Sequence, residues 1–244
     1  MQLIDQFVRD GDRLFRWRSY LPLVLVPVLL GGMMADTQPC ASREGERLWE
    51  ALAAAVALGG LALRIWAVGT APAGTSERST VDPRASELRT TGLYSILRHP
   101  LYVANGLIGL GLALFTGLWY LGVITLATTL LYYERIAARE EAFLEERFGE
   151  AFVEWAGRVP AMVPLWSGYV PGRAPFSWGR VIQELHGLSV IAAGVFVLDV
   201  VQESWRAGRW AFDPLWAWFF GVVAVAFAVF AVTKKTVRRL SPRM

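Results

Sequence analysis

Arg98-His99-Pro100-Leu101-Tyr102 stands at the start of a stretch, His99 to Tyr133, in which no residue is charged when histidine is counted as neutral. As one straight helix this stretch would be roughly 50 Å long, whereas the hydrocarbon core of a membrane is about 30 Å thick. The chain must therefore turn back, and Phe115-Thr116-Gly117-Leu118-Trp119 contains the polar residue and glycine that favour a turn. We predict a hairpin of two short membrane helices.

A charged segment, Glu134 to Trp155, follows the hairpin and carries apolar residues at helical spacing. We predict that it forms a separate interfacial helix in the headgroup region on the cytoplasmic side. This helix would return Glu140 and Glu141 to the membrane surface, where the Arg98-to-Tyr102 segment begins the hairpin. Ionisable groups gathered beside lipid are costly unless they serve a function. The two segments together are therefore the candidate functional site.

Composition indicates an all-α, polytopic membrane protein. Of the 244 residues, 55% are hydrophobic and only 18% are charged, which is too apolar for an ordinary soluble domain. Together with the hairpin, the apolar runs predict about six transmembrane helices, the other four near residues 20–35, 49–68, 187–201 and 214–233. We interpret a Pro-, Gly- and Trp-rich stretch, Pro160 to Gly179, as a partly re-entrant loop.

Three regions follow from this pattern. Residues 1–48 hold an N-terminal tail, the first span and an outer loop, residues 49–165 the core with both motifs, and residues 166–244 the last two spans with a basic tail. With both termini in the cytoplasm, 19 of the 24 Lys and Arg residues lie on the cytoplasmic side and 4 on the outside. The positive-inside rule favours this orientation, so both motif segments are expected to face the cytoplasm.

Several other classes of protein are disfavoured. The net charge is only +3 and the aromatic residues are not interleaved with basic ones, so no nucleic-acid partner is expected. Cys40 is the only cysteine, and His99 and His186 are the only histidines, so we expect no metal site. The chain has neither a Walker loop nor a Gly-x-Gly-x-x-Gly motif after a strand pattern, which argues against a Rossmann or P-loop domain.

Taken singly, the motif residues also have simpler interpretations. Arg98 and Tyr102 could anchor the chain at the membrane interface, and Pro100 could simply begin a helix. Glu140-Glu141 could be a solvated charge run on a surface helix, and Arg64 could extend its guanidinium to the interface from an apolar helix.

Two motifs at this separation carry a family resemblance: Thr91-Gly92-Leu93-Tyr94-Ser95-Ile96-Leu97-Arg98-His99-Pro100-Leu101-Tyr102-x-x-Asn105 and Glu140-Glu141-x-x-Leu144-x-x-x-Phe148-Gly149-x-x-Phe152-x-x-Trp155. They resemble the isoprenylcysteine carboxyl methyltransferase and phospholipid methyltransferase family of membrane enzymes, over about residues 60–165. Two positions depart from the family pattern. Ala104 stands where many members have Gly, and Phe152-x-x-Trp155 replaces Tyr-x-x-Tyr.

The resemblance implies S-adenosylmethionine as the cofactor. It implies that His99 and Tyr102 line the cofactor pocket and that Pro100 shapes the backbone there. The same motif match implies that the second segment binds the polar end of the cofactor through Glu140, Glu141 and Leu144.

The expected acceptor is an anionic oxygen of a lipid, a phosphate or a carboxylate, because such a group needs no general base and needs a cation to orient it. Arg98, which the resemblance puts at the mouth of the pocket, and Arg64 are the candidate catalytic residues. An amine acceptor would first have to lose a proton, and Glu140 or Glu141 would then be the nearest base.

The extra C-terminal spans and the loop at residues 69–78 resemble the bacterial branch that methylates lipid A phosphate. This resemblance predicts an inner-membrane enzyme with a membrane lipid as its partner. Within the family, an isoprenylcysteine-type carboxyl or phospholipid amine methyltransferase is the alternative.

Two alternatives come from other classes of protein. A sterol-reductase-like NADPH oxidoreductase would share a similar motif, but such enzymes generally follow it with Gly and an acidic residue, where this chain has Ala104-Asn105. A non-catalytic membrane scaffold is the other alternative. The oligomeric state is left open.

Overall fold

The structure, a computed structural model, describes residues 3–17, 20–35, 42–70, 87–172 and 175–240. Within these ranges the chain is helical and has no strand, only one isolated bridge between Gly92 and Val170, so the all-α prediction is confirmed. Cys40 and residues 71–78 of the predicted loop lie outside the described part. The helices, in chain order, are α1 (Leu3–Trp17), α2 (Leu21–Ala35), α3 (Arg43–Gly69), α4 (Pro100–Phe115), α5 (Trp119–Phe148), α6 (Glu150–Arg158), α7 (Trp178–Val181), α8 (Leu185–Ala207) and α9 (Pro214–Leu240).

Each apolar run that predicted a membrane span is helical in the structure. Within the described ranges, three stretches can cross a membrane by length and composition: Arg43–Gly69, Trp178–Ala207 and Pro214–Thr233. Val24–Ala35 and Pro100–Phe115 are shorter apolar helices. The chain is therefore an all-α membrane protein, while the number of six spans stays a prediction.

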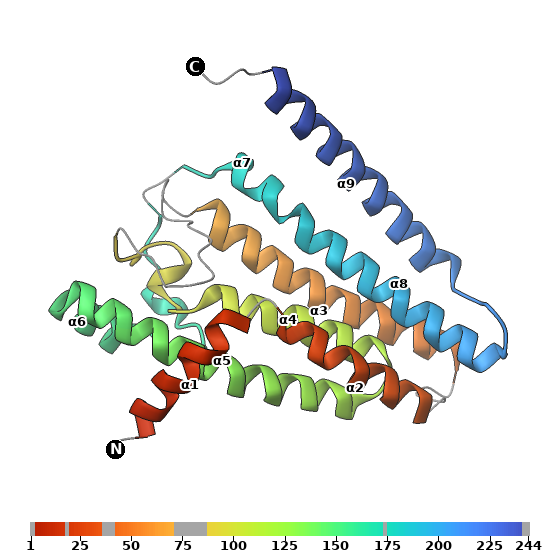
Figure 1. The fold of residues 1–244 in the computed structure, drawn as a ribbon, viewed down its shortest axis with the longest axis horizontal. Helices are drawn as coiled ribbons and strands as arrows, with labels where there is room; N and C mark the ends of the chain where they lie inside the picture. Colours follow the sequence, from red (N-terminus) through yellow and green to blue (C-terminus); the bar gives the residue numbers. More distant parts are fainter. Residues whose placement is uncertain (1–2, 18–19, 36–41, 71–86, 173–174, 241–244) are drawn as a thin grey trace.

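Among the described helices, the antiparallel pair α3 and α4 forms the most extensive contact (Figure 1). A side chain at Gly60 of α3 would come within 2.6 Å of the carbonyl oxygen of Ala104, and one at Gly111 of α4 within 2.6 Å of that of Ala53. Small residues let helix backbones approach in this way. Gly60 therefore lies at this helix contact, whereas the neighbouring Gly59 has open space around it.

The predicted hairpin turn is confirmed, since α4 ends at Phe115 and α5 begins at Trp119. The Thr116 hydroxyl donates to the carbonyl of Ala113 at 2.7 Å and accepts from the amide of Leu118 at 3.3 Å. These bonds satisfy backbone groups that the helix ends leave without helical partners.

The prediction of a separate interfacial helix from Glu134 to Trp155 is wrong in its bounds. Helix α5 continues without interruption from Trp119 to Phe148, and the chain bends only at Gly149, which has φ +54°. The apolar stretch gives way to charged residues at Glu134, but Glu, Arg, Ala and Leu are all good helix formers. The change in polarity therefore does not end the helix, and the short α6 follows only after the glycine.

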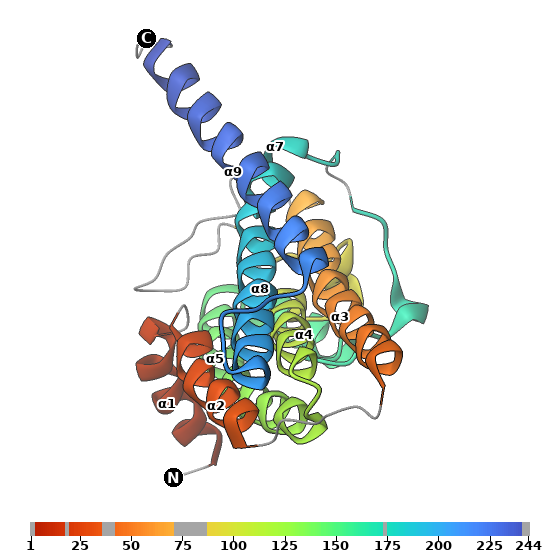
Figure 2. The same cartoon turned by 90° about the vertical axis from the view of Figure 1, so that its right-hand side faces the viewer.

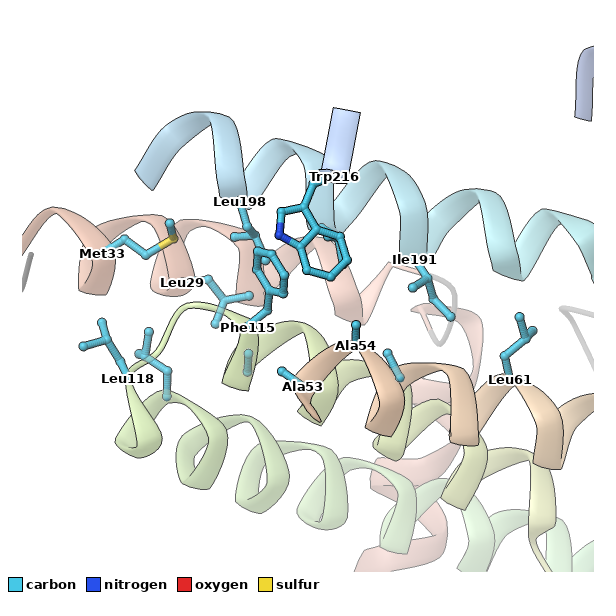
Figure 3. Close-up of a cluster of buried hydrophobic side chains, with 14 residues drawn as sticks. Leu29, Met33, Ala53, Ala54, Leu61, Phe115, Leu118, Ile191, Leu198 and Trp216 are labelled. Atoms are coloured by element: carbon cyan, nitrogen blue, oxygen red, sulfur yellow. The ribbon is translucent and has the colours of Figure 1, made fainter. Parts of the chain in front are cut away.

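The main apolar core lies where α2, α3, α4, α5, α8 and α9 meet, and Figure 3 shows it. Phe115 at the hairpin turn is 1% exposed, and its ring meets the indole of Trp216 edge-on at 5.0 Å. Leu29 of α2 and Ile191 of α8 belong to the same cluster. The C-terminal helices are thus packed into the core rather than appended to it.

Polar contacts join α3, α8 and α9 at the end of α3 opposite to Arg64. Arg43 binds both carboxylate oxygens of Glu203, at 3.0 and 3.2 Å, and Arg206 pairs with Glu46. The indole of Trp216 donates to Glu50 at 2.9 Å. Helix α9 is therefore fixed at its start, whereas its C-terminal end extends away from the other helices in both views (Figures 1 and 2).

Helix α1 forms in the segment that was predicted only as an N-terminal tail. It crosses α5, with Phe15 buried against it and Leu14 accepting a hydrogen bond from the Tyr132 hydroxyl at 2.9 Å. Asp12 pairs with Arg139. On α5, these contacts lie just before the carboxylate pair.

The close approach of α1 to α5 predicts a specific mutational effect. In Gly11→Ala the new Cβ would overlap the carbonyl oxygen of Arg135 and press on Arg139, so we expect a loss of about 1–3 kcal/mol in the free energy of unfolding, the usual cost of overpacking. Gly59→Ala is the matched control, a helical glycine with open space, and alanine there favours the helix by up to about 1 kcal/mol. Thermal unfolding in detergent measures both, and equal midpoints would contradict the assigned contact.

Candidate active site

The first side chains of α4 are arranged by the proline motif. Pro100 occupies the first turn, where its missing N–H leaves no helical bond unmade, and the preceding His99 has φ −121° and ψ 59°. Tyr102 and Asn105 follow His99 at intervals of three residues, a spacing that puts side chains on one helix face. This face turns toward α5, and His99 is only 7% exposed.

The backbone before α4 is held by the segment that follows α6. The amides of Arg98 and His99 donate to the carbonyls of Pro160 and Ala161, at 2.9 and 3.2 Å. Further along, the amide of Val170 donates to the buried Ser95 hydroxyl at 2.8 Å. The stretch predicted as a re-entrant loop therefore binds the motif backbone, and its passage into the membrane stays a prediction.

The carboxylate pair of α5 contacts the start of α4, so the structure brings the two motif segments together. His99 Nε2 lies 2.7 Å from Glu141 Oε1, and the Tyr102 hydroxyl donates to Glu140 Oε1 at 2.5 Å. His99 Nδ1 lies 3.7 Å from Glu140 Oε2. Both carboxylates are about one quarter exposed, 25% and 24%, and thus can still be reached by a ligand.

Three rings form a stack beside the carboxylates. The rings of His99 and Tyr102 are 5.6 Å apart at 16°, and those of Tyr102 and Tyr133 are 4.5 Å apart at 15°. Tyr133 is seven residues before Glu140 on α5, two helical turns along the same face. The site therefore combines a flat aromatic wall with two anionic groups at one end.

Arg98 lies beside the carboxylate pair, and its place at the mouth of a cofactor pocket stays a prediction. Its Nε is 3.2 Å from Glu141 Oε1, and its Nη1 donates to the carbonyl of Ala156 at 3.2 Å. The Nε–H is buried and makes no hydrogen bond of good geometry. A buried donor without such a bond is costly, so this group is suited to an additional acceptor.

Arg64 reaches the same site from α3, but its guanidinium is engaged by protein groups. Its Nε donates to Glu184 at 2.8 Å and its Nη1 to the Asn105 side-chain oxygen at 2.6 Å. The Asn105 amide nitrogen in turn donates to the Tyr133 hydroxyl at 3.1 Å. The two predicted catalytic arginines thus lie in different surroundings.

The remaining predicted residues have packing roles. Pro100 is buried at the start of α4, and Leu144 packs with Phe152 and Trp155 in a small cluster under α6. Tyr94 belongs to that cluster, and burial raises the pKa of its phenol above the usual value, so it stays neutral at physiological pH.

Sequence reasoning missed three residues of the site. Asn105 is a lone polar residue three positions after Tyr102 in an apolar helix, a pattern that could have singled it out. Tyr133 ended the uncharged stretch and was not considered as a site residue, although it shares a helix face with Glu140. Glu184 carries no local signal, because its partner Arg64 is 120 residues away. In the described ranges, no group of three or more His, Cys, Asp or Glu side chains could hold a metal ion.

The helical membrane fold agrees with the comparison with known proteins, which supports a membrane protein of the methyltransferase type in general. Residues 49–151 match the model of the phospholipid methyltransferase family, which confirms the predicted resemblance. The match covers α3, α4 and α5, which carry His99, Tyr102 and both carboxylates.

Two curated proteins resemble the chain over part of its length. The cobalt-zinc-cadmium resistance protein CzcN of Cupriavidus metallidurans is 44% identical over 119 residues, which are 48% of this chain and 52% of that protein. The nickel-cobalt-cadmium resistance protein NccN of Alcaligenes xylosoxydans xylosoxydans is 40% identical over 83 residues, 33% of this chain and 38% of that protein. The chain thus spans about half the length of the first relative and less of the second. No solved structure matches.

Proposed function

We propose that the protein transfers a methyl group from S-adenosylmethionine to an anionic oxygen of a membrane lipid, with a lipid phosphate such as that of lipid A as the preferred acceptor. The observation that carries the proposal is the convergence of the two family motifs. A ring stack, two reachable carboxylates and a buried arginine N–H meet where α4 begins.

The residues present fit S-adenosylmethionine, which when bound supplies an activated methyl group on a sulfonium. The faces of Tyr102 and Tyr133 tolerate a nearby cation. Glu140 and Glu141 can accept hydrogen bonds from ribose hydroxyls or an ammonium group, and such charge-assisted bonds are the stronger kind. His99 holds Glu141 in position. Fixing both reactants in line is the main contribution that these residues would make to the rate.

Arg98 is the residue that we assign to the acceptor. An anionic oxygen is already a nucleophile at neutral pH and needs only orientation, which a guanidinium provides through its fixed fork of donors. The Arg98 Nε–H supports this assignment because it is buried without a well-formed hydrogen bond. We further propose that the site faces the cytoplasm of a bacterial inner membrane, in keeping with the distribution of Lys and Arg.

Loss of one carboxylate charge tests the cofactor proposal. In Glu141→Gln the side chain keeps its size but loses its charge, so we expect S-adenosylmethionine to bind about 10- to 100-fold more weakly, the worth of one charge-assisted hydrogen bond. The matched control is Glu154→Gln, because Glu154 is 74% exposed and pairs with Arg158 on α6, away from the site. Calorimetry on detergent-purified protein measures both affinities, and an unchanged affinity in Glu141→Gln would remove this residue from the cofactor site.

The acceptor class is tested separately at Arg98. For Arg98→Gln we expect the KM for a phosphate-bearing lipid to rise about tenfold or more, while the affinity for S-adenosylmethionine changes much less, because one charged hydrogen bond to the acceptor is lost. Initial rates with phosphate-, carboxylate- and amine-bearing lipids in mixed micelles give the comparison. Faster turnover of the amine lipid by the wild-type protein would favour the phospholipid amine alternative, with Glu140 or Glu141 as base.

The names of the two relatives suggest a second role, in resistance to divalent metals. We propose that such a role would depend on methylation at this site. A host strain that expresses the wild-type protein should then tolerate cobalt, zinc or cadmium better than one with Glu141→Gln at equal protein level. Growth inhibition curves measure this, and equal tolerance of the two strains would separate metal resistance from methyl transfer.

A further inference from the structure

We propose that Glu184, which lies outside the family segment of residues 49–151, is a positioning residue that acts through two other side chains, Arg64 and Asn105, on the ring stack of the site. The expected effect of Glu184 on cofactor binding rests on the proposed function. This role of Glu184 assigns a task to the C-terminal part of the chain, to which the family match gives none.

The first step is the ion pair with Arg64. Glu184 is 4% exposed, and its two oxygens lie 2.8 Å from Arg64 Nε and 3.5 Å from Nη2. A carboxylate facing two nitrogens of one guanidinium fixes the plane of that group as well as its distance. Glu184 also compensates the charge of Arg64.

The second step is the orientation of the Asn105 amide. Arginine can only donate, so the group that faces Arg64 Nη1 at 2.6 Å must be the oxygen of Asn105. The amide nitrogen of Asn105 then points to the Tyr133 hydroxyl, 3.1 Å away, as a donor. If Arg64 moved, the amide would be free to turn over and this donor would be lost.

The third step links Tyr133 to the predicted cofactor residues. Its ring is stacked at 4.5 Å on Tyr102, whose hydroxyl donates to Glu140 and whose ring is also stacked with that of His99. The chain of contacts therefore runs from the segment before α8, through α3 and α4, to the carboxylate pair on α5. Each contact is polar or aromatic and each has a defined direction.

A double-mutant cycle between Glu184→Gln and Tyr133→Phe tests the proposal. We expect Glu184→Gln to weaken S-adenosylmethionine binding about tenfold in the wild-type background and to have little further effect in Tyr133→Phe, as for residues of one hydrogen-bond network. Tyr133→Phe keeps the ring and removes only the hydroxyl that Asn105 contacts. Additive effects of the two substitutions would overturn the proposal, since Glu184 would then act by another route.

Glu203→Gln is the matched control. Glu203 also binds an arginine through both oxygens, but on the other end of α8, so its substitution should leave the affinity unchanged. If Glu184→Gln does not yield folded protein, Arg64→Lys replaces it in the same cycle, because lysine keeps the charge and loses the planar fork.

The midpoint of thermal unfolding, measured on the same four proteins, separates this inference from the proposed function. Absence of S-adenosylmethionine binding by the folded wild-type protein would refute the proposed function. The unfolding midpoints would still show whether Glu184 and Tyr133 are coupled, and independent shifts would refute the chain of contacts itself.

Discussion

The hydrogen bond between His99 Nε2 and Glu141 Oε1 is the contact on which the site depends, because it joins the start of α4 to the polar half of α5. Three quarters of the Glu141 side chain is withdrawn from solvent, and a carboxylate there is stable only beside donors and cations. His99 and Arg98 supply them, and the backbone bonds from residues 160–161 hold both residues in place. Fold and chemistry are therefore constrained by the same few side chains.

The features of the fold and the site that could be predicted from the sequence are those that depend on neighbouring residues. Arg98-His99-Pro100 and Glu140-Glu141 are polar exceptions at the ends of apolar stretches, so their meeting at one surface could be predicted from hydropathy and length. The continuity of α5 could not be predicted in this way, because the change in polarity at Glu134 resembles a helix boundary. Most residues on both sides of Glu134 are nevertheless good helix formers. Glu184 could not be predicted either, since only tertiary packing brings it to Arg64.

Elements on both sides of the family segment support the three helices that carry the motifs. Helix α1 packs Phe15 against the cluster that contains Tyr133. On the other side, Trp216 of α9 reaches the hairpin turn at Phe115, and Ile191 of α8 belongs to the same core. Helix α1 thus packs on one side of the three helices, and α8 and α9 pack on the other side (Figures 1 and 3). The positions of α3, α4 and α5 are therefore constrained by these flanking helices as well as by their mutual packing.

The continuity of α5 also sets a length scale. Tyr133 and Glu140 lie on one unbroken helix, so the stacked ring and the carboxylate are separated along its axis by about 10 Å, seven residues at 1.5 Å each. One residue inserted between them would rotate both carboxylates by roughly 100° around the axis, away from α4. The position and direction of the carboxylate pair relative to α4 are thus set by the number of residues between Tyr133 and Glu140. This part of α5 should tolerate exchange of exposed side chains better than an insertion or a deletion.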